Sequence, residues 1–217
     1  MTEIKKLHDY RKEYSQGGLS HYEALPDPLE QFNHWFDQAV SAGLPEPNAM
    51  TLATADLEGN VSARIVLLKE VDSKGFIFYS NYKSRKAKDI EKNPKGSLVF
   101  LWLELERQVR IEGVIKKVTE KESDEYFKRR PRESQLGAWV SEQSTEIPGR
   151  DVLVENFSQL KKKFEDKPIP RPGFWGGYRI IPNMIEFWQG RPGRLHDRIR
   201  YIKSDNKNTW KRIRLAP

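Results

Sequence analysis

The chain has no cysteine among its 217 residues. That absence excludes disulfide bonds, thiolate nucleophiles, and cysteine-ligated zinc or iron–sulfur sites. The histidines are His8, His21, His34 and His196. No pair of them has the spacing of metal ligands, so we expect no metal site.

Long apolar runs are also missing, since none approaches the roughly 20 residues that span a bilayer. The segment Met1 to Tyr14 is charged and lacks the apolar core of a signal peptide. No Gly-x-Gly-x-x-Gly follows a strand pattern and no P-loop occurs, which disfavours a Rossmann dinucleotide site and a nucleotide triphosphatase. We therefore expect a soluble cytoplasmic protein that does not contact a membrane.

What the chain does have is positive charge and large aromatic side chains. Its 38 Lys and Arg outnumber 31 Asp and Glu, which gives a formal charge of +7, and aromatics make up 11%. The aromatics can fill a sizeable core, which argues against disorder. The charge suits anionic partners such as nucleic acid, acidic lipid or phosphorylated small molecules, without choosing among them.

The sequence pattern predicts a flexible segment over residues 1–26 and a single domain over 27–217. Asp27-Pro28 is typical of a helix start, and Leu29, Phe32, Phe36, Ala39 and Val40 recur at helical spacing until Gly43. Further helices are expected from Ser84 to Glu91 and over 120–129, 133–142 and 150–165. Strands are expected over 49–55, 61–68, 75–80, 97–103, 107–118, 176–181, 184–188, 198–203 and 209–214.

This order of strands favours a mainly β fold, an antiparallel barrel with flanking helices, over a doubly wound sheet. The pair Gly176-Gly177 is interpreted as a turn.

Arg194, His196 and Arg198 would share one face of a strand, where side chains alternate. Cationic groups gathered in this way suit an anionic or electron-rich ligand, and the alternative is a solvated edge strand whose charges block aggregation.

Arg64 and Lys69 end an apolar strand segment on opposite faces, unless a bulge intervenes. The alternative is a buried strand with solvated ends. Arg85 and Lys86 open a helix behind Ser84, where free backbone N–H groups would bind phosphate. An ordinary capped helix start explains the same pattern.

Tyr126 and Arg130 stand one helical turn apart, and Ser134 is placed to cap the next helix beyond Pro131. Together these side chains suit a phosphate monoester, although a basic corner between two helices is the commoner arrangement. Nucleic-acid binding is disfavoured, because most tryptophans lie in apolar or Gly-rich strands rather than on a basic face.

Residues 185–198 carry the most specific pattern: Ile-Glu-Phe-Trp-Gln-Gly-Arg-Pro-Gly-Arg-Leu-His-Asp-Arg. This stretch resembles the signature of the pyridoxamine 5′-phosphate oxidase family. The likeness continues in order through Arg11–Tyr14, Arg64–Lys69, Tyr79-Ser80, Ser84–Lys86, Glu106–Gln108, Arg130–Gln135, Gly137–Ser141, Gln143-Ser144, Phe174–Gly177 and Arg214–Pro217. It spans nearly the whole chain, so chance agreement is negligible.

The resemblance implies an FMN-binding split β-barrel that forms a homodimer with two FMN sites. It implies oxidation of pyridoxamine 5′-phosphate or pyridoxine 5′-phosphate to pyridoxal 5′-phosphate, with O2 as electron acceptor and H2O2 as product. The cofactor-binding residues it implies are Arg64, Ile65, Val66, Leu67, Leu68, Lys69, Tyr79, Ser80, Arg85, Lys86 and Gln108, with Gln143, Ser144, Trp188 and Arg198 from the other subunit.

For the substrate the resemblance implies Lys69, Tyr126, Arg130 and Ser134 at the phosphate. It places Arg194, Leu195 and His196 near the pyridine ring, Arg194 and His196 with catalytic roles, and Arg11, Lys12, Glu13 and Tyr14 in a mobile lid. The alternative is a non-catalytic or differently specific flavin-binding split-barrel protein, which would not need a second phosphate pocket.

Overall fold

The computed structural model describes the chain except residues 1–12, 16, 21 and 205–208. Arg11 and Lys12 of the expected lid lie outside the described residues. The chain divides into two compact units. The first unit comprises residues 1–47, 100–110 and 184–217, and the second comprises 48–99 and 111–183. The single domain expected for residues 27–217 stays a prediction.

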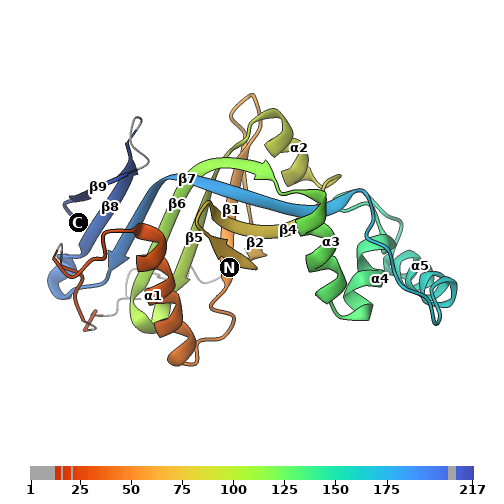
Figure 1. The fold of residues 1–217 in the computed structure, drawn as a ribbon, viewed down its shortest axis with the longest axis horizontal. Coiled ribbons are helices and arrows are strands. Elements are labelled where there is room, and N and C mark those ends of the chain that lie inside the picture. The colour runs from red at the N-terminus through yellow and green to blue at the C-terminus, as the bar shows by residue number, and fades with distance from the viewer. Residues whose placement is uncertain (1–12, 16, 21, 205–208) are drawn as a thin grey trace, which may run out of the picture. The chain divides into compact units, whose positions relative to one another are not determined.

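Strands dominate the described residues (Figure 1). They are β1 (Ala49–Ala55), β2 (Val61–Leu67), β3 (Glu70–Asp72), β4 (Gly75–Asn81), β5 (Lys95–Trp102), β6 (Arg107–Lys117), β7 (Trp175–Gln189), β8 (Asp197–Lys203) and β9 (Trp210–Arg214). Their order in the sheet is β2-β1-β5-β6-β7-β4-β3, and β8 pairs with both β7 and β9. The pairings of β1 with β2 and β5, of β4 with β3 and β7, and of β8 with β7 and β9 are antiparallel.

The helices are α1 (Pro28–Ser41), α2 (Arg85–Lys92), α3 (Glu120–Arg129), α4 (Arg132–Val140) and α5 (Arg150–Lys163). A mainly β fold with flanking helices is thereby confirmed. The short strand β3 was not predicted. None of these helices is long and apolar enough to cross a membrane.

Helix α1 begins where the sequence predicts, because Asp27 is its N-cap. The Asp27 carboxylate accepts the backbone N–H of Leu29 at 2.6 Å, and Pro28 has no N–H to leave unpaired. The prediction of its buried face was partly wrong. Trp35 is buried, whereas Val40 is 53% exposed.

Aromatic side chains form the core of the first unit. The ring of Phe32 meets that of Phe100 with centroids 4.9 Å apart, and Trp35 meets Phe187 edge-on at 5.2 Å. Phe187 in turn contacts Tyr201. Edge-to-face pairs of this kind add to the burial of apolar area, so α1 is held against β5 and β7 by its aromatic face.

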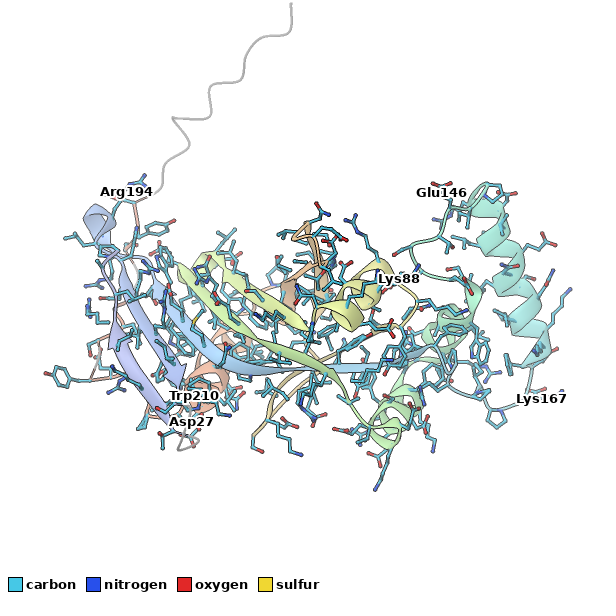
Figure 2. The ribbon with its side chains drawn as sticks, turned by 90° about the horizontal axis from the view of Figure 1, so that it is seen from above. Asp27, Lys88, Glu146, Lys167, Arg194 and Trp210 are labelled. Atoms are coloured by element: carbon cyan, nitrogen blue, oxygen red, sulfur yellow. The ribbon has the colours of Figure 1, made fainter. Side chains whose placement is uncertain are left out.

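In the second unit, α3 and α4 cover a cluster of buried apolar side chains, Phe127, Leu136, Ile169 and Trp175. Figure 1 shows α4 and α5 side by side, and in Figure 2 the labelled Glu146 and Lys167 lie just beyond the two ends of α5. Helix α3 starts with a capping box, in which Thr119 and Glu122 each accept a backbone N–H of the other.

One long strand, β7, replaces the two short strands predicted over 176–181 and 184–188, and Gly176-Gly177 lies inside it rather than in a turn. The error came from Pro182, which cannot donate a ladder hydrogen bond. The strand tolerates it because β4 pairs only as far as Ile180 and β8 only from Met184.

Glycines make room beside that proline. A Cβ on Gly113 would stand 2.2 Å from the carbonyl oxygen of Ile181, and one on Gly75 would stand 2.0 Å from that of Ile180. The close backbone approach of β6 and β4 to this part of β7 therefore requires glycine at both positions.

Candidate functional site

The second unit contains a cavity of about 850 Å³, within the size range of small-molecule and cofactor sites. It is lined by Ser62, Ala63, Arg64, Ile65, Val66, Leu67, Lys69, Tyr79, Ser80, Asn81, Arg85, Lys86, Tyr126, Arg130, Ser134, Gly137, Ala138, Ser141, Gln143, Ser144 and Trp175. Most of the side chains predicted for cofactor and substrate phosphate are therefore brought to one place. Leu68 is not, because it is buried in the core.

The predicted placement of Arg64 and Lys69 on opposite faces was wrong. Both line the same cavity, because the chain changes its pairing partner between them. Leu68 donates its backbone N–H to Asn48, next to β1, whereas Lys69 donates to Ile77 of β4. This switch breaks the alternation of side chains on which the parity argument depends.

Lys86 is the most buried cation of the cavity, at 9% exposed. Its Nζ donates to Gln143 Oε1 at 2.8 Å and to the hydroxyls of Ser80 and Ser84 at 3.1 Å each. Among the described residues no carboxylate pairs with it. Desolvation, and then the charge of Arg64, lower the Lys86 pKa to about 8. An anion beside Lys86 would supply the missing counter-charge.

Gln143 and Ser144 line this cavity as residues of the same chain. The sequence interpretation assigned both to the other subunit. No second chain is needed to bring Gln143 to Lys86, because the segment after α4 carries Gln143 over the start of α2. The exposed ion pair between Lys83 and Glu142 joins the same two segments.

Arg64 reaches the cavity from β2. Its guanidinium donates to the carbonyl oxygen of Leu52 and to the hydroxyls of Thr54 and Ser62. Burial lowers the Arg64 pKa, and the carboxylate of Asp89 works against that shift. Arg85 lies at the exposed start of α2, where the Ser84 hydroxyl bonds to Asn81 instead of capping the helix. The first backbone N–H groups of α2 therefore stay available to an anion.

Aromatic rings form another part of the cavity wall. Tyr79 stacks on Tyr126 with centroids 3.8 Å apart and on Trp175 at 5.4 Å. Tyr79 stands opposite Gly177 on β7, where a Cβ would come within 2.9 Å of its ring. Burial, and then the charge of Glu70, raise the Tyr79 pKa to about 12, so its hydroxyl stays protonated at neutral pH.

Arg130 lies against these rings, with its guanidinium carbon 4.5 Å from the centre of the Trp175 ring. Burial lowers the Arg130 pKa. Its Nη1 is buried without a hydrogen-bond partner among the described residues. A buried, unpaired donor is costly, and a bound acceptor would remove that cost.

The predicted roles of Arg130 and Ser134 in the helices need correction. Arg130 is the C-cap of α3, and Ser134 lies inside α4, which begins at Arg132 after Pro131. The end of α3 is capped instead by Gln135, whose Nε2 donates to the carbonyl oxygens of Phe127, Lys128 and Arg130. The capping role of Gln135 at the end of α3 was not predicted from the sequence.

The remaining predicted residues belong to the first unit. They are Glu13, Tyr14, Gln108, Trp188, Arg194, Leu195, His196 and Arg198. Tyr14 meets the rings of Trp188 and His196 edge-on at 5.6 and 5.5 Å. Part of the expected lid is thereby in contact with part of the expected pyridine-binding segment.

Arg194 and His196 do not lie on a strand face with Arg198, as was predicted. Pro192–Arg194 forms a 3₁₀ turn, β8 begins only at Asp197, and His196 Nδ1 accepts the backbone N–H of Arg191. Arg194 is exposed, and Figure 2 shows its side chain projecting from this turn. Within the described residues it has no hydrogen-bond or ion-pair partner.

Arg198, by contrast, makes three hydrogen bonds within the chain. Its Nε and Nη2 donate to Glu186 at 2.9 and 2.8 Å, and its Nη1 donates to the carbonyl oxygen of Ala216. Glu186 is buried and also pairs with Arg200 at 2.9 Å. Apart from its place in the family-like signature, nothing in the sequence indicated that Glu186 is a buried carboxylate.

The cavity could hold a flat aromatic ligand that carries an anionic group. Trp175 and the two tyrosines provide ring surfaces, and Lys86, Arg64 and Arg85 provide positive charge without a direct carboxylate partner among the described residues. Arg130 provides a further donor at the aromatic wall. The residues present therefore fit a phosphorylated aromatic cofactor and a second anion.

Comparison with known proteins gives a consistent result. A family model described as pyridoxamine 5′-phosphate oxidase matches residues 36–164. Another, described as the pyridoxine 5′-phosphate oxidase C-terminal dimerisation region, matches residues 175–217. The chain is similar to pyridoxine/pyridoxamine 5′-phosphate oxidases of Cupriavidus taiwanensis and Salinibacter ruber, each 54% identical over 99% of this chain and 100% of the relative.

Among solved structures, the chain is similar to PhzG from Burkholderia lata 383 in complex with tetrahydrophenazine-1-carboxylic acid. That match has a TM-score of 0.88 and 30% identity, over 94% of this chain and 100% of the other. A pyridoxamine 5′-phosphate oxidase-related, FMN-binding protein from Nostoc punctiforme aligns with a TM-score of 0.71 at 14% identity, over 92% of this chain and 98% of the other. The second likeness concerns the fold alone, and the split-barrel fold class is confirmed.

Proposed function

This chain belongs to the pyridoxamine 5′-phosphate oxidase family, and from that membership we propose that it oxidises pyridoxamine 5′-phosphate and pyridoxine 5′-phosphate to pyridoxal 5′-phosphate, with FMN as cofactor and O2 as electron acceptor. One observation carries the proposal. The cavity has two groups of cations, Lys86 with Arg64 and Arg85, and Arg130 beside Trp175, and no hydrogen bond within the described part of the chain joins the two groups. Two such groups suit two phosphates, one on the cofactor and one on the substrate.

FMN would be held with its phosphate at Lys86, Arg64, Arg85 and the open start of α2. Charge-assisted hydrogen bonds to phosphate are the strong ones, and no carboxylate among the described residues pairs with the buried Lys86 ammonium. Residues Ile65 to Leu67 and Gln143 would line the rest of the flavin site.

The substrate phosphate would be bound by Arg130, Tyr126, Ser134 and Lys69. The unpaired Nη1 of Arg130 supports this assignment, since a phosphate oxygen would satisfy it. The tyrosine hydroxyls stay protonated and serve as donors. Arg130 is fixed in place by Trp175 beneath its guanidinium and by Gln135 on its backbone, so little ordering remains to be done when substrate arrives.

When bound, the flavin supplies a hydride acceptor at N5 and passes the electrons to O2, with release of H2O2. With pyridoxine 5′-phosphate, the C4′ alcohol loses a hydride and a proton. Pyridoxamine 5′-phosphate likewise loses a hydride from C4′ and a proton from its amine, and water then hydrolyses the resulting imine to the aldehyde and ammonia. The protein's own task is to fix the geometry of C4′ and to exclude solvent.

Arg194 and His196 would hold the pyridine ring of the substrate. The exposed guanidinium of Arg194, without a partner among the described residues, supports a role in binding a ligand rather than in the fold. We propose that Gln108, Trp188, Arg194, His196 and Arg198 complete the site from the second subunit of a homodimer. The family model for the C-terminal dimerisation region supports a dimer.

A differently specific flavin oxidase is the second candidate. It is favoured by the likeness to PhzG, which was solved in complex with tetrahydrophenazine-1-carboxylic acid, a carboxylic acid rather than a phosphate ester. The donors at Arg130 discriminate between the two, because a substrate without phosphate would leave the Arg130 Nη1 unsatisfied.

The test is aerobic turnover by purified full-length protein. We expect a yellow protein that releases FMN on denaturation and produces pyridoxal 5′-phosphate and H2O2 from both phosphorylated vitamers, with little turnover of unphosphorylated pyridoxine. Equal turnover of pyridoxine would contradict the phosphate pocket. A colourless protein that cannot be reconstituted with FMN would contradict the proposal as a whole.

The dimer has its own measurement. Light scattering of the FMN-loaded protein should give twice the chain mass of 25.4 kDa. An active, FMN-loaded species at the chain mass would show that Trp188 and Arg198 are not supplied by a second subunit.

A further inference from the structure

A closed hydrogen-bond network connects Arg64 to Asp89 of α2. Arg64 Nη1 donates to Thr54 Oγ1 at 2.8 Å, and Nη2 donates to Ser62 Oγ at 2.5 Å. Both hydroxyls donate onward to one oxygen, Oδ2 of Asp89, at 2.8 and 3.2 Å. Two β-strands and one helix thereby meet at a single carboxylate oxygen.

Asp89 is a buried carboxylate, at 8% exposed, and it forms no ion pair with any residue that the structure describes. It lies one turn after Arg85 on α2, the helix that also carries Lys86. Its acceptor oxygen is used by the hydroxyls of Thr54 and Ser62, so its hydrogen bonds reach Arg64 only through these two side chains.

The network leaves part of the Arg64 guanidinium without a hydrogen-bond partner among the described residues. A guanidinium has five N–H groups. The two on Nη1 go to Thr54 and to the carbonyl oxygen of Leu52, and one on Nη2 goes to Ser62. The Nε hydrogen and the second Nη2 hydrogen have no partner among the described residues.

These two remaining hydrogens point the same way. The hydroxyl oxygens of Thr54 and Ser62 are 3.4 Å apart, so both occupy the edge of the guanidinium shared by Nη1 and Nη2. The free Nη2 hydrogen must then lie beside that of Nε. Two parallel N–H groups form the fork that binds phosphate or carboxylate in a bidentate manner.

We propose that Asp89 is a positioning residue for the cofactor phosphate: through Thr54 and Ser62 it turns the Arg64 guanidinium so that only its Nε/Nη2 fork faces the anion. The proposal rests on the proposed function, since it takes that anion to be the phosphate of FMN. It extends that function to residues that the family signature did not indicate, namely Thr54, Ser62 and Asp89.

The direction in which Asp89→Ala changes FMN affinity distinguishes a positioning role from direct electrostatic repulsion. A carboxylate near an anion site repels the anion, so its removal alone would tighten FMN binding. Positioning predicts the opposite. We expect Asp89→Ala to weaken FMN binding about tenfold, the size of one charge-assisted hydrogen bond. Riboflavin, which has no phosphate, should bind as it does to the wild type.

The experiment titrates full-length apo-protein with FMN and with riboflavin, following flavin fluorescence. Asp89→Asn keeps an acceptor oxygen and should stay within about threefold of wild type for FMN, which is the rescue expected of a positioning role. A matched pair of neutral changes repeats the test without altering charge: Thr54→Val removes the hydroxyl and should weaken FMN binding, whereas Thr54→Ser keeps it and should not. If Asp89→Ala does not fold, the two Thr54 variants test the proposal without it.

Three results would overturn the proposal: tighter FMN binding by Asp89→Ala, equal loss of FMN and riboflavin affinity in that variant, or an undiminished effect of Thr54→Val in an Arg64→Ala background. Wild-type protein that binds FMN and riboflavin equally would instead refute the placement of the flavin phosphate, and the proposed function with it. If Arg64→Ala weakens FMN selectively while Asp89→Ala and Thr54→Val do not, the proposed function stands and only the positioning role fails.

Discussion

The cavity of the second unit and the turn before β8 in the first unit both present cations, but they hold them differently. Lys86 makes three hydrogen bonds within the chain, and Arg64 makes three. Arg194 is exposed and makes none with the described residues, and its backbone is left-handed, with φ 60°. The cavity cations are oriented before any ligand binds, whereas Arg194 is left for a ligand to engage.

This difference separates what each substitution should change. Loss of an oriented cavity cation should reduce the affinity for an anionic group without touching the reaction itself. Loss of the Arg194 guanidinium should change turnover and leave FMN affinity unaltered. The following substitutions test that separation.

The largest effect is expected from Lys86→Met. The variant removes a buried ammonium from the proposed phosphate site and keeps a side chain of similar length. We expect FMN affinity to fall at least about a hundredfold, the upper range for a charge-assisted hydrogen bond, with riboflavin affinity unchanged. The apo-protein should not lose thermal stability, because the desolvated charge was unfavourable. Lys88→Met, on the exposed side of the same helix, is the control and should bind FMN normally.

Arg194→Ala should cut kcat/KM about a hundredfold while FMN stays bound, because a small misplacement of the reacting atoms costs that much. Lys at this position should rescue poorly, since a point charge does not reproduce the planar fork. His196→Ala should cost less. Stopped-flow bleaching of the flavin by pyridoxine 5′-phosphate under anaerobic conditions measures the step. Bleaching at the wild-type rate would remove Arg194 from it, and loss of flavin would make it a cofactor residue.

Arg130→Ala should raise the KM for pyridoxine 5′-phosphate about ten- to a hundredfold, the loss of one charge-assisted hydrogen bond to phosphate. The Kd for FMN should stay unchanged, since the cofactor phosphate is assigned to Lys86 and Arg64. Steady-state kinetics with measured flavin occupancy provides the check. An unchanged KM at full occupancy would place the substrate phosphate elsewhere.

The pKa of Lys86 makes a smaller, pH-dependent prediction. In the apo-protein that pKa is lowered from 10.5 to about 8, so above pH 8 the amine is neutral and must take up a proton to bind an anion. The Kd for FMN should therefore rise with pH above about 8, by up to about tenfold per unit. The free energy of unfolding of the apo-protein should rise over the same window, between pH 8 and 10.5, because the unfolded chain binds the extra proton. Titrations of wild type and Lys86→Met should differ in both slopes.

Local signals in the sequence predicted much of this molecule, and the errors share a cause. Helix α1 follows from Asp27-Pro28, and the cavity cations Arg85 and Lys86 follow from a helix start, because both depend on neighbours in the chain. The strand break at Pro182 and the opposite faces of Arg64 and Lys69 were wrong, because distant partners decide them: Gly75 and Gly113 in one case, Ile77 in the other.

The site shows the same limit. Trp175 reaches the wall of the cavity because β7 passes beside β4, and in the sequence it stood out only as part of the family-like segment Phe174–Gly177. Thr54, Ser62 and Asp89 carry no signal at all, since a network among two strands and a helix exists only after they pack. The turn before β8 could have been predicted from Pro192-Gly193, because a Pro-Gly dipeptide is typical of a turn and interrupts a strand.

The smallest effect concerns the left-handed backbone of Arg194. It is a difference in stability between two variants that both lack the guanidinium. A non-glycine residue pays a steric cost at φ 60° that glycine does not, of the order of 1 kcal/mol. Part of that gain is lost because glycine also has more freedom in the unfolded chain. Arg194→Gly should therefore be more stable than Arg194→Ala by up to about 1 kcal/mol, although both lack the guanidinium and should be equally slow. Urea denaturation of the two FMN-loaded variants measures the difference. If Arg194→Ala is the more stable, the turn stores no strain, and the exposed arginine is held in place by a ligand or a partner subunit rather than by its own backbone.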